Sequence, residues 1–139
     1  MTGVVLDTHV LVWLLDGSRR LGTSSRELIA TSAERTAVSF SAISAWEIAM
    51  LVAKGRLELD RDVLDWLGSA TRLPGVRVAP LSIEIAVGST RLPGEMHGDP
   101  ADRLIVATAR HLDAALVTAD RALLDYAVSG HLDVHAAGD

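Results

Sequence analysis

Four acidic residues of this 139-residue chain lie within or beside strongly apolar segments, where an ionised carboxylate is costly. Asp7 lies in the run VVLDTHVLVWLL, and Glu47 lies in SAISAWEIAMLVAKG. Asp102 comes shortly before the apolar residues LIVATA, and Asp120 follows ALVT after one alanine. Carboxylates in such places either keep their protons or hold a cation, so these four residues are the first candidates for chemistry.

If the fold brings these acids together, their repulsion requires one of two outcomes: some pKa values rise, or cations occupy the site. Four carboxylates held ~5 Å apart would repel by roughly 3 kcal/mol per pair at an effective dielectric constant of ~20. A whole domain is stable by only ~5–15 kcal/mol. Such a cluster cannot stay fully ionised without cations. Because the chain has no cysteine, its oxygen donors favour Mg²⁺ or Mn²⁺ over zinc.

Most of these positions also have a local structural explanation. Asp7 can cap the helix that follows it, because aspartate is favoured just before a helix. Asp99 as a cap, Pro100 as the first helical residue and Asp102 in the first turn would together make a complete helix start. Asp120 lies near the start of a further predicted helix, where a negative charge is favourable. Capping and metal binding therefore remain alternatives for these acids.

Glu47 has no comparable local role. The residues three and four positions away on its predicted helix include no basic side chain that could pair with it. Glu47 is therefore expected on or beside the buried face, leaning toward the same edge as the other acids. None of the five histidines shows zinc-ligand spacing on a helix. His97, two residues before Asp99, is the one histidine considered as a ligand, with a solvated loop side chain as the alternative.

The segments that must position these acids alternate between strands and helices. Short apolar runs predict strands at 3–6, 37–40, 76–81 and 115–118, with an edge strand at 131–135. Apolar periodicity and capping residues predict helices at 8–15, 23–33, 41–55, 61–72, 82–92, 99–112 and 119–128. This alternation predicts an α/β fold with a mainly parallel sheet covered on both faces. Since ligands bind at the carboxyl ends of such strands, Asp7, Asp102 and Asp120 would share one edge.

Composition indicates one domain over residues 1–139, since a 49% hydrophobic content suffices for one core and the chain is too short for two. The lack of cysteine excludes disulfides and thiolate chemistry. No segment reaches the ~20 apolar residues of a membrane span, and the N-terminus has no signal-peptide pattern, so a cytoplasmic protein is expected. The net charge of −5 argues weakly against a nucleic-acid binder that depends on bulk electrostatics, but cations bound by four acids would nearly balance it.

Four blocks of the sequence, in this order, resemble the PIN-domain ribonucleases, and specifically the VapC-type toxins of type II VapBC toxin–antitoxin pairs. The blocks are LDTHVLVWLL, SAISAWEIAMLVAKGRL, LPGEMHGDPADRLIVATA and LVTADRALLDY. Each block alone is a weak signal, whereas the ordered set spans nearly the whole chain and is specific.

The resemblance implies a PIN-like α/β/α sandwich with a central, mainly parallel sheet, and Mg²⁺- or Mn²⁺-dependent endonuclease activity on RNA. The catalytic and metal-binding residues that it implies are Asp7, Glu47, Asp102 and Asp120. Asp99 is implied as an outer metal ligand, and Thr118 as a hydroxyl that supports the site. Arg103 and Arg121, each next to an acid, are candidates for contact with substrate phosphate, with a solvent-facing arginine that balances its neighbour as the alternative.

The resemblance also implies partners. A VapC-type toxin acts on RNA, is held inactive by a small VapB-type antitoxin and is usually a homodimer, and no membrane partner is implied. The antitoxin often places an amphipathic helix in an apolar groove and a basic side chain near the acids. Trp13, Trp46 and Trp66 are candidates for lining this groove, and core packing is the alternative for at least two of them.

Two other functions stay open on the sequence. A PIN-like module that binds or scaffolds without catalysis would keep the fold, although all four acids are present. A phosphatase of the haloacid dehalogenase type also has an aspartate after its first strand. Its motif requires a second aspartate two residues later, and this chain has His9 there, which makes the phosphatase the weaker alternative.

Overall fold

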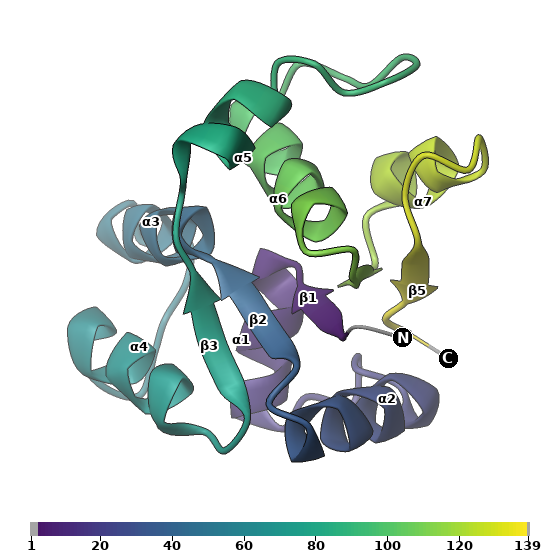
Figure 1. The fold of residues 1–139 in the computed structure, drawn as a ribbon. Coiled ribbons are helices and arrows are strands. Elements are labelled where there is room, and N and C mark those ends of the chain that lie inside the picture. Colours follow the sequence, from purple (N-terminus) through teal and green to yellow (C-terminus); the bar gives the residue numbers. More distant parts are fainter. Residues whose placement is uncertain (1–2, 139) are drawn as a thin grey trace.

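The computed structural model describes residues 3–138 (Figure 1). Within this range five strands form one sheet in the order β3-β2-β1-β4-β5, and every neighbouring pair is parallel. The strands are β1 (Val4–Leu6), β2 (Val38–Ser41), β3 (Val76–Ala79), β4 (Ala115–Thr118) and β5 (Val134–Ala136). The helices are α1 (Thr8–Asp16), α2 (Thr23–Glu34), α3 (Ala42–Ala53), α4 (Val63–Arg72), α5 (Ile83–Gly88), α6 (Pro100–His111) and α7 (Arg121–Ala127). The expected α/β/α fold with a parallel central sheet is confirmed.

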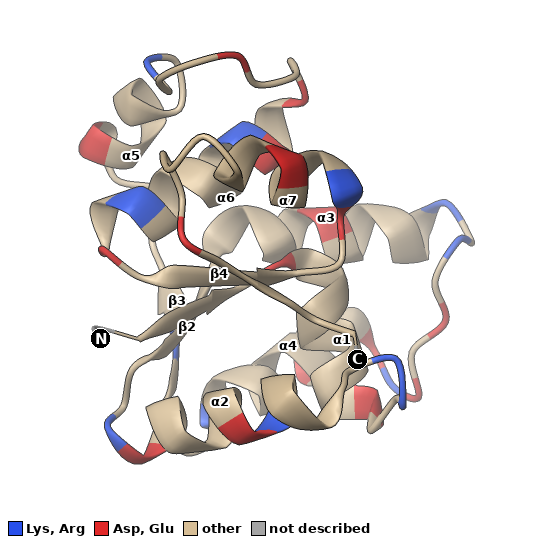
Figure 2. Ribbon diagram, turned by 90° about the vertical axis from the view of Figure 1, so that its right-hand side faces the viewer, with Lys and Arg blue, Asp and Glu red and all other residues tan. Residues whose placement is uncertain are grey.

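Helices cover both faces of this sheet. Figure 2 views the sheet edge-on, with α2 and α4 below it and α6 and α7 above it. Leu6 and Phe40 belong to the buried cluster that includes side chains of α1, α2 and α4, whereas Val5 and Leu116 belong to the cluster that includes α6 and α7. Because successive strand residues face opposite sides, Val5 and Leu6 serve different clusters. Burial on both faces explains why the strands are so uniformly apolar.

The strand order places β1 at the centre of the sheet. The chain runs from β1 outward through β2 to β3, and then returns across the sheet to β4 and β5 (Figure 1). The carboxyl ends of β2, β1 and β4 therefore lie side by side, and the order of the strands reverses next to β1. An open parallel sheet binds its ligands at such a point. The residues that follow these three strands are thus at the edge where a ligand site is expected.

Several element boundaries differ from the sequence expectation. The strand expected at 76–81 ends at Ala79, because Pro80 has no N–H with which to continue the ladder. The helix expected at 82–92 ends at Gly88, and the edge strand expected at 131–135 is shorter and begins later, at Val134. The differences leave Asp7, Asp102 and Asp120 at the strand and helix ends where the sequence placed them, and they leave Glu47 within α3. None of the helices within residues 3–138 is long and apolar enough to cross a bilayer.

Candidate active site

Asp7 directly follows β1 at the centre of the sheet and directly precedes α1. It is almost fully buried, with 4% of its surface exposed. Its Oδ1 accepts a hydrogen bond from the backbone N–H of Thr8 at 2.8 Å, and its Oδ2 accepts one from the hydroxyl of Thr118 at 2.6 Å. Asp7 therefore caps α1 and also lies at the edge of the sheet where a ligand site is expected.

Thr118 ends β4 and connects two of the acids. Its buried hydroxyl donates to Asp7 and accepts a hydrogen bond of 3.0 Å from the backbone N–H of Asp120. Asp120 caps α7, because its Oδ1 accepts from the backbone N–H of Ala122 at 2.8 Å. The cap uses one oxygen of the carboxylate, so the other can serve a ligand. A single hydroxyl thus fixes the positions of two acids that lie far apart in sequence.

Glu47 lies in the second turn of α3, which begins after β2 with Ser41 as its cap. The hydroxyl of Thr8 donates to Oε1 of Glu47 at 2.6 Å. The same hydroxyl lies 2.8 Å from the buried hydroxyl of Ser44, one turn earlier on α3. Since the Thr8 proton is directed to the carboxylate, Ser44 is the donor to Thr8. This chain of hydroxyls ties the Glu47 carboxylate to the start of α1.

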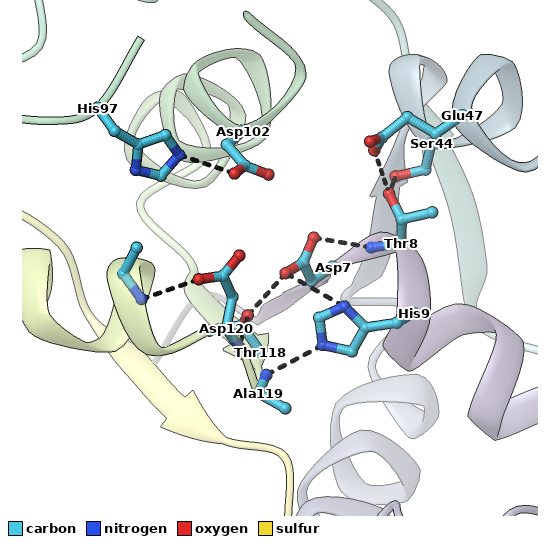
Figure 3. Close-up of polar contacts among 11 residues, drawn as sticks. Asp7, Thr8, His9, Ser44, Glu47, His97, Asp102, Thr118, Ala119 and Asp120 are labelled. Atoms are coloured by element: carbon cyan, nitrogen blue, oxygen red, sulfur yellow. Dashed lines mark hydrogen bonds and ion pairs between the residues drawn. The ribbon is translucent and has the colours of Figure 1, made fainter. Parts of the chain in front are cut away.

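Asp102 lies in the first turn of α6. Asp99 caps this helix by accepting a hydrogen bond of 3.0 Å from the backbone N–H of Asp102, and Pro100 is the first helical residue, as the sequence predicted. His97 Nε2 lies 2.8 Å from Oδ2 of Asp102 (Figure 3). His97 therefore contacts an acid of the site from the loop that precedes α6, while Asp99 is an exposed cap beside the site.

The two candidate arginines differ in their surroundings. The guanidinium of Arg103 donates to three backbone carbonyls, those of Ser89 at 2.9 Å, Met96 at 3.0 Å and His97 at 3.3 Å. It therefore fastens the loop that carries His97 to α6. Arg121 is the exposed first residue of α7. For both arginines, contact with a substrate phosphate stays a prediction.

The four acids line one pocket of about 350 Å³. Figure 3 shows their side chains around a common space, with Asp7 and Asp120 at strand ends and Glu47 and Asp102 on two helices. The other lining residues are Thr8, His9, Val12, Trp13, Leu51 and Leu57. A larger cavity of about 420 Å³ lies between α1, α2, α4 and β3 and is lined mainly by apolar side chains. The smaller pocket is the candidate site, because the converging carboxylates are there.

Burial and mutual repulsion raise the pKa of two of these acids. Burial is the largest cause for Glu47; the hydrogen bond from Thr8 opposes it, and the charges of Asp7 and Asp102 add to the rise. Burial is also the largest cause of the raised pKa of Asp102, and the charges of Asp7 and Asp120 contribute in the same direction. The pKa values of Glu47 and Asp102 therefore respond to the charges of acids from other segments, as expected for members of one cluster.

The donor set fits a hard divalent cation, because carboxylate oxygens surround the pocket and the chain has no thiolate to favour zinc. Among residues 3–138, no three histidine or acidic side chains are grouped closely enough to hold one ion by themselves. Mg²⁺ is compatible with this spacing, since it commonly keeps several waters and takes one or two carboxylates together with substrate phosphate oxygens. Asp7 is best placed to provide such a carboxylate, because two hydrogen bonds already orient it.

The sequence pattern did not indicate three side chains of this site, those of Thr8, Ser44 and His9. His9 Nε2 accepts a hydrogen bond from the backbone N–H of Ala119 at 3.1 Å, and His9 Nδ1 lies 3.7 Å from Oδ2 of Asp7. The positions of these three residues relative to the acids could have indicated them. Thr8 and His9 directly follow the acid at the end of β1, and Ser44 lies one turn before the acid of α3, on the same helix face.

Known proteins resemble this chain in sequence and in fold. Residues 4–129 match the family model of the PIN domain. Ribonuclease VapC22 of Mycobacterium tuberculosis is 37% identical over 123 residues, which cover 88% of this chain and 91% of that relative. Both findings confirm the resemblance that the four sequence blocks carry.

Two solved structures share the fold. VapBC2 from Rickettsia felis, bound to a DNA fragment from its promoter, has a TM-score of 0.70 at 17% identity, with 95% of this chain and 96% of that chain covered. A toxin–antitoxin complex from Klebsiella pneumoniae has a TM-score of 0.65 at 18% identity, with 99% of both chains covered. At these identities the two structures support the fold alone. The family match over residues 4–129 and the 37% identical relative decide the family: this chain belongs to the PIN-domain family.

Proposed function

We propose that this chain is a metal-dependent endoribonuclease that acts in the cytoplasm as the toxin of a type II VapBC-like pair. The observation that carries this proposal is the convergence of four carboxylates, from four separate segments, on one pocket at the carboxyl edge of the sheet. The 37% identical relative that is named a ribonuclease supports it. Arg121, exposed at the start of α7, is the proposed contact for substrate phosphate.

In this proposal the carboxylates hold the metal, and hydroxyls orient the carboxylates. Asp7 is the central ligand, held by Thr118, and Glu47 is held by Thr8. Asp102 and Asp120 contribute directly or through water, with Asp99 as an outer ligand. The chemistry that bound Mg²⁺ or Mn²⁺ would supply is a more acidic water for attack on the phosphodiester and positive charge near the leaving 3′ oxygen.

The experiment is cleavage of RNA by the purified protein in Mg²⁺ or Mn²⁺. EDTA should abolish cleavage, and Asp7→Asn should lower the rate by more than the ~10–100-fold that is typical for residues one step removed from a metal. Asp65→Asn is the matched control, because Asp65 is an exposed aspartate in the first turn of α4, and it should cleave at the wild-type rate. Cleavage that survives both EDTA and Asp7→Asn would refute the proposal.

A catalytically inactive binding or scaffold module is the second candidate, because the carboxylates could hold a cation without turnover. Calorimetric titration with Mn²⁺ distinguishes the two. An inactive module would bind the metal and leave every RNA intact, whereas the proposed enzyme both binds metal and cleaves.

The antitoxin is the proposed protein partner. The apolar cavity of about 420 Å³ between α1, α2, α4 and β3 is suited to the apolar face of an amphipathic helix. Trp66 lines this cavity, whereas Trp13 lines the acidic pocket and Trp46 is 56% exposed on α3. The structures from Rickettsia felis and Klebsiella pneumoniae that share this fold are a VapBC complex and a toxin–antitoxin complex, and the proposed partner is of the same kind.

A homodimer is also proposed. Ile83 and Val87 lie one turn apart on the short helix α5 and are 80% and 41% exposed, and Leu81 just before the helix is 41% exposed. Exposed apolar side chains gathered on one segment commonly mark a protein interface. The face formed by Leu81, Ile83 and Val87 is the proposed contact between two copies of the chain.

A further inference from the structure

The acidic pocket has a second half that metal binding and hydrolysis do not use. Besides the acids, Thr8 and His9, its lining has an apolar half that consists of Val12 and Trp13 from α1, Leu51 from α3 and Leu57 from the segment after α3. At about 350 Å³ the pocket has the size of a small-molecule site and exceeds what a hydrated cation and a phosphate group need. The apolar half is therefore available for another part of the substrate.

His9 and Trp13 form the aromatic part of the pocket lining. They lie one helical turn apart on α1, with ring centroids 4.9 Å apart and planes tilted by 60°. Nε2 of His9 accepts the backbone N–H of Ala119, which holds the imidazole ring to the loop after β4. In the neutral ring the proton is therefore on Nδ1, which lies 3.7 Å from Oδ2 of Asp7. The two rings together form an aromatic surface, in which His9 lies beside the central acid and Trp13 lies next to His9.

Core packing does not account fully for these two side chains. Trp66, a core tryptophan, is 2% exposed, whereas Trp13 and His9 both remain partly exposed and line the pocket. The exposed side chain of Arg20 places its guanidinium carbon 6.0 Å from the centre of the Trp13 ring. The aromatic surface thus lies between the acids on one side and a positive charge on the other, an arrangement that suits a flat group attached to phosphates.

We propose that Trp13 and His9 form a stacking subsite for an unpaired RNA base next to the scissile phosphate. The inference rests on the proposed ribonuclease function and adds to it the part of the substrate that is recognised. Proteins bind unpaired RNA bases by stacking them on aromatic side chains, and each base offers a flat face whatever its sequence. The phosphate of the same nucleotide would lie at the carboxylates, and the next phosphate along the strand would lie near Arg20.

The test begins with a pool of single-stranded RNA of random sequence, cleaved in Mg²⁺ and sequenced to locate the cut. The best substrate is then made with and without the base on each side of the cut. Trp13→Leu should raise KM by about 10-fold or more, as the loss of one base stack does, with kcat little changed. Trp13→Phe keeps an aromatic face and should recover most of the loss. Trp46→Leu, which changes an exposed tryptophan outside the pocket, should leave KM unchanged.

The abasic substrates separate a stacking role from a structural one. At one of the two positions, removing the base should raise the KM of the wild type by about the same factor as Trp13→Leu does. The same abasic substrate should not raise the KM of Trp13→Leu any further. His9→Leu tests the second ring in the same way. A wild-type KM in Trp13→Leu, or an equal abasic penalty in the wild type and in Trp13→Leu at both positions, would overturn the subsite.

Failure of the proposed function gives a different result. If the wild type cuts no RNA, the Kd for labelled single-stranded RNA is measured by fluorescence anisotropy in Mg²⁺. Weaker binding by Trp13→Leu than by Trp13→Phe then supports the subsite although the enzyme proposal has failed. Equal Kd values for the wild type and Trp13→Leu overturn the subsite.

Discussion

The hydroxyl of Thr118 donates a hydrogen bond of 2.6 Å to Oδ2 of Asp7, between residues 111 positions apart in sequence. Both residues are buried at the carboxyl ends of adjacent strands. The same hydroxyl accepts the backbone N–H of Asp120. The orientation of the central acid therefore depends on a side chain from the far end of the chain.

Replacement of Thr118 by valine should weaken both stability and activity. Valine keeps the shape but removes the donor to a buried carboxylate, which costs ~1–3 kcal/mol in the free energy of unfolding. Cleavage should fall by ~10–100-fold, as for other residues that orient a metal ligand. Thr118→Ser keeps the hydroxyl and should stay near the wild type in both thermal melting and RNA cleavage. Equal activity of the valine and serine variants would contradict this role.

Glu47→Gln should stabilise the metal-free protein at neutral pH. The pKa of Glu47 is raised, chiefly by burial, so its protonated form favours the folded state. The stability that protonated Glu47 contributes is fully present below its unfolded pKa of about 4.3. It is lost as the pH rises through the higher pKa of Glu47 in the folded state. Because the residue is half-exposed, solvent screening limits the gain from Gln to at most about 1 kcal/mol. Melting in EDTA between pH 4 and 8 measures it, and a variant less stable than the wild type at pH 7 would be the opposite result.

Metal should have a larger stabilising effect on the wild type than on the acid variants. A ligand that binds only the folded state stabilises it by ~2.7 kcal/mol at a hundred times its Kd. Addition of Mn²⁺ should therefore raise the melting temperature of the wild type, while Asp7→Asn should show a smaller rise at the same concentration. Asp65→Asn, altered on the exposed start of α4, should respond like the wild type. An equal rise in Asp7→Asn would place the metal elsewhere.

Arg103 and Arg121 should give different signatures on replacement by glutamine. Arg103 binds three carbonyls, two of them in the loop before α6. Arg103→Gln should speed hydrogen exchange in residues 94–99, because that loop loses its anchor. Arg121→Gln should leave exchange unchanged, raise KM and reduce the salt dependence of RNA binding by about one phosphate contact. A reduced salt dependence in Arg103→Gln, with slow exchange retained, would instead assign the phosphate contact to Arg103.

Ile83→Glu should convert the proposed homodimer to a monomer. Ile83 is 80% exposed on α5, and a charge at the centre of an apolar contact would have to be desolvated there. Val128→Glu is the matched control, because Val128 is 85% exposed and lies at the end of a different helix, α7. Light scattering after gel filtration gives the mass of each. A wild-type monomer, or a dimeric Ile83→Glu protein, would exclude this contact.

Local signals in the sequence predicted much of the fold. Apolar strands of four or so residues indicated a sheet buried on both faces, and the Asp-Pro pair at the start of α6 was predicted as a cap and first residue. Interactions between distant segments could not be predicted in this way. The Thr8 hydroxyl binds Glu47 and Ser44 across 39 and 36 residues, and only the packing of α3 against α1 brings them together. The direction of Arg103 likewise depends on a loop whose course the sequence does not specify.

The central position of β1 has a consequence for synthesis of the protein. Of the strands, β1 is made first, whereas its neighbour β4 is made only after β2 and β3, so the sheet cannot close on that side until Thr118 has been made. Until then the first acid has no Thr118 to orient it, and Asp120 has not been made. A chain that has not been extended through β4 therefore lacks both the hydroxyl that orients Asp7 and one of the four acids of the pocket.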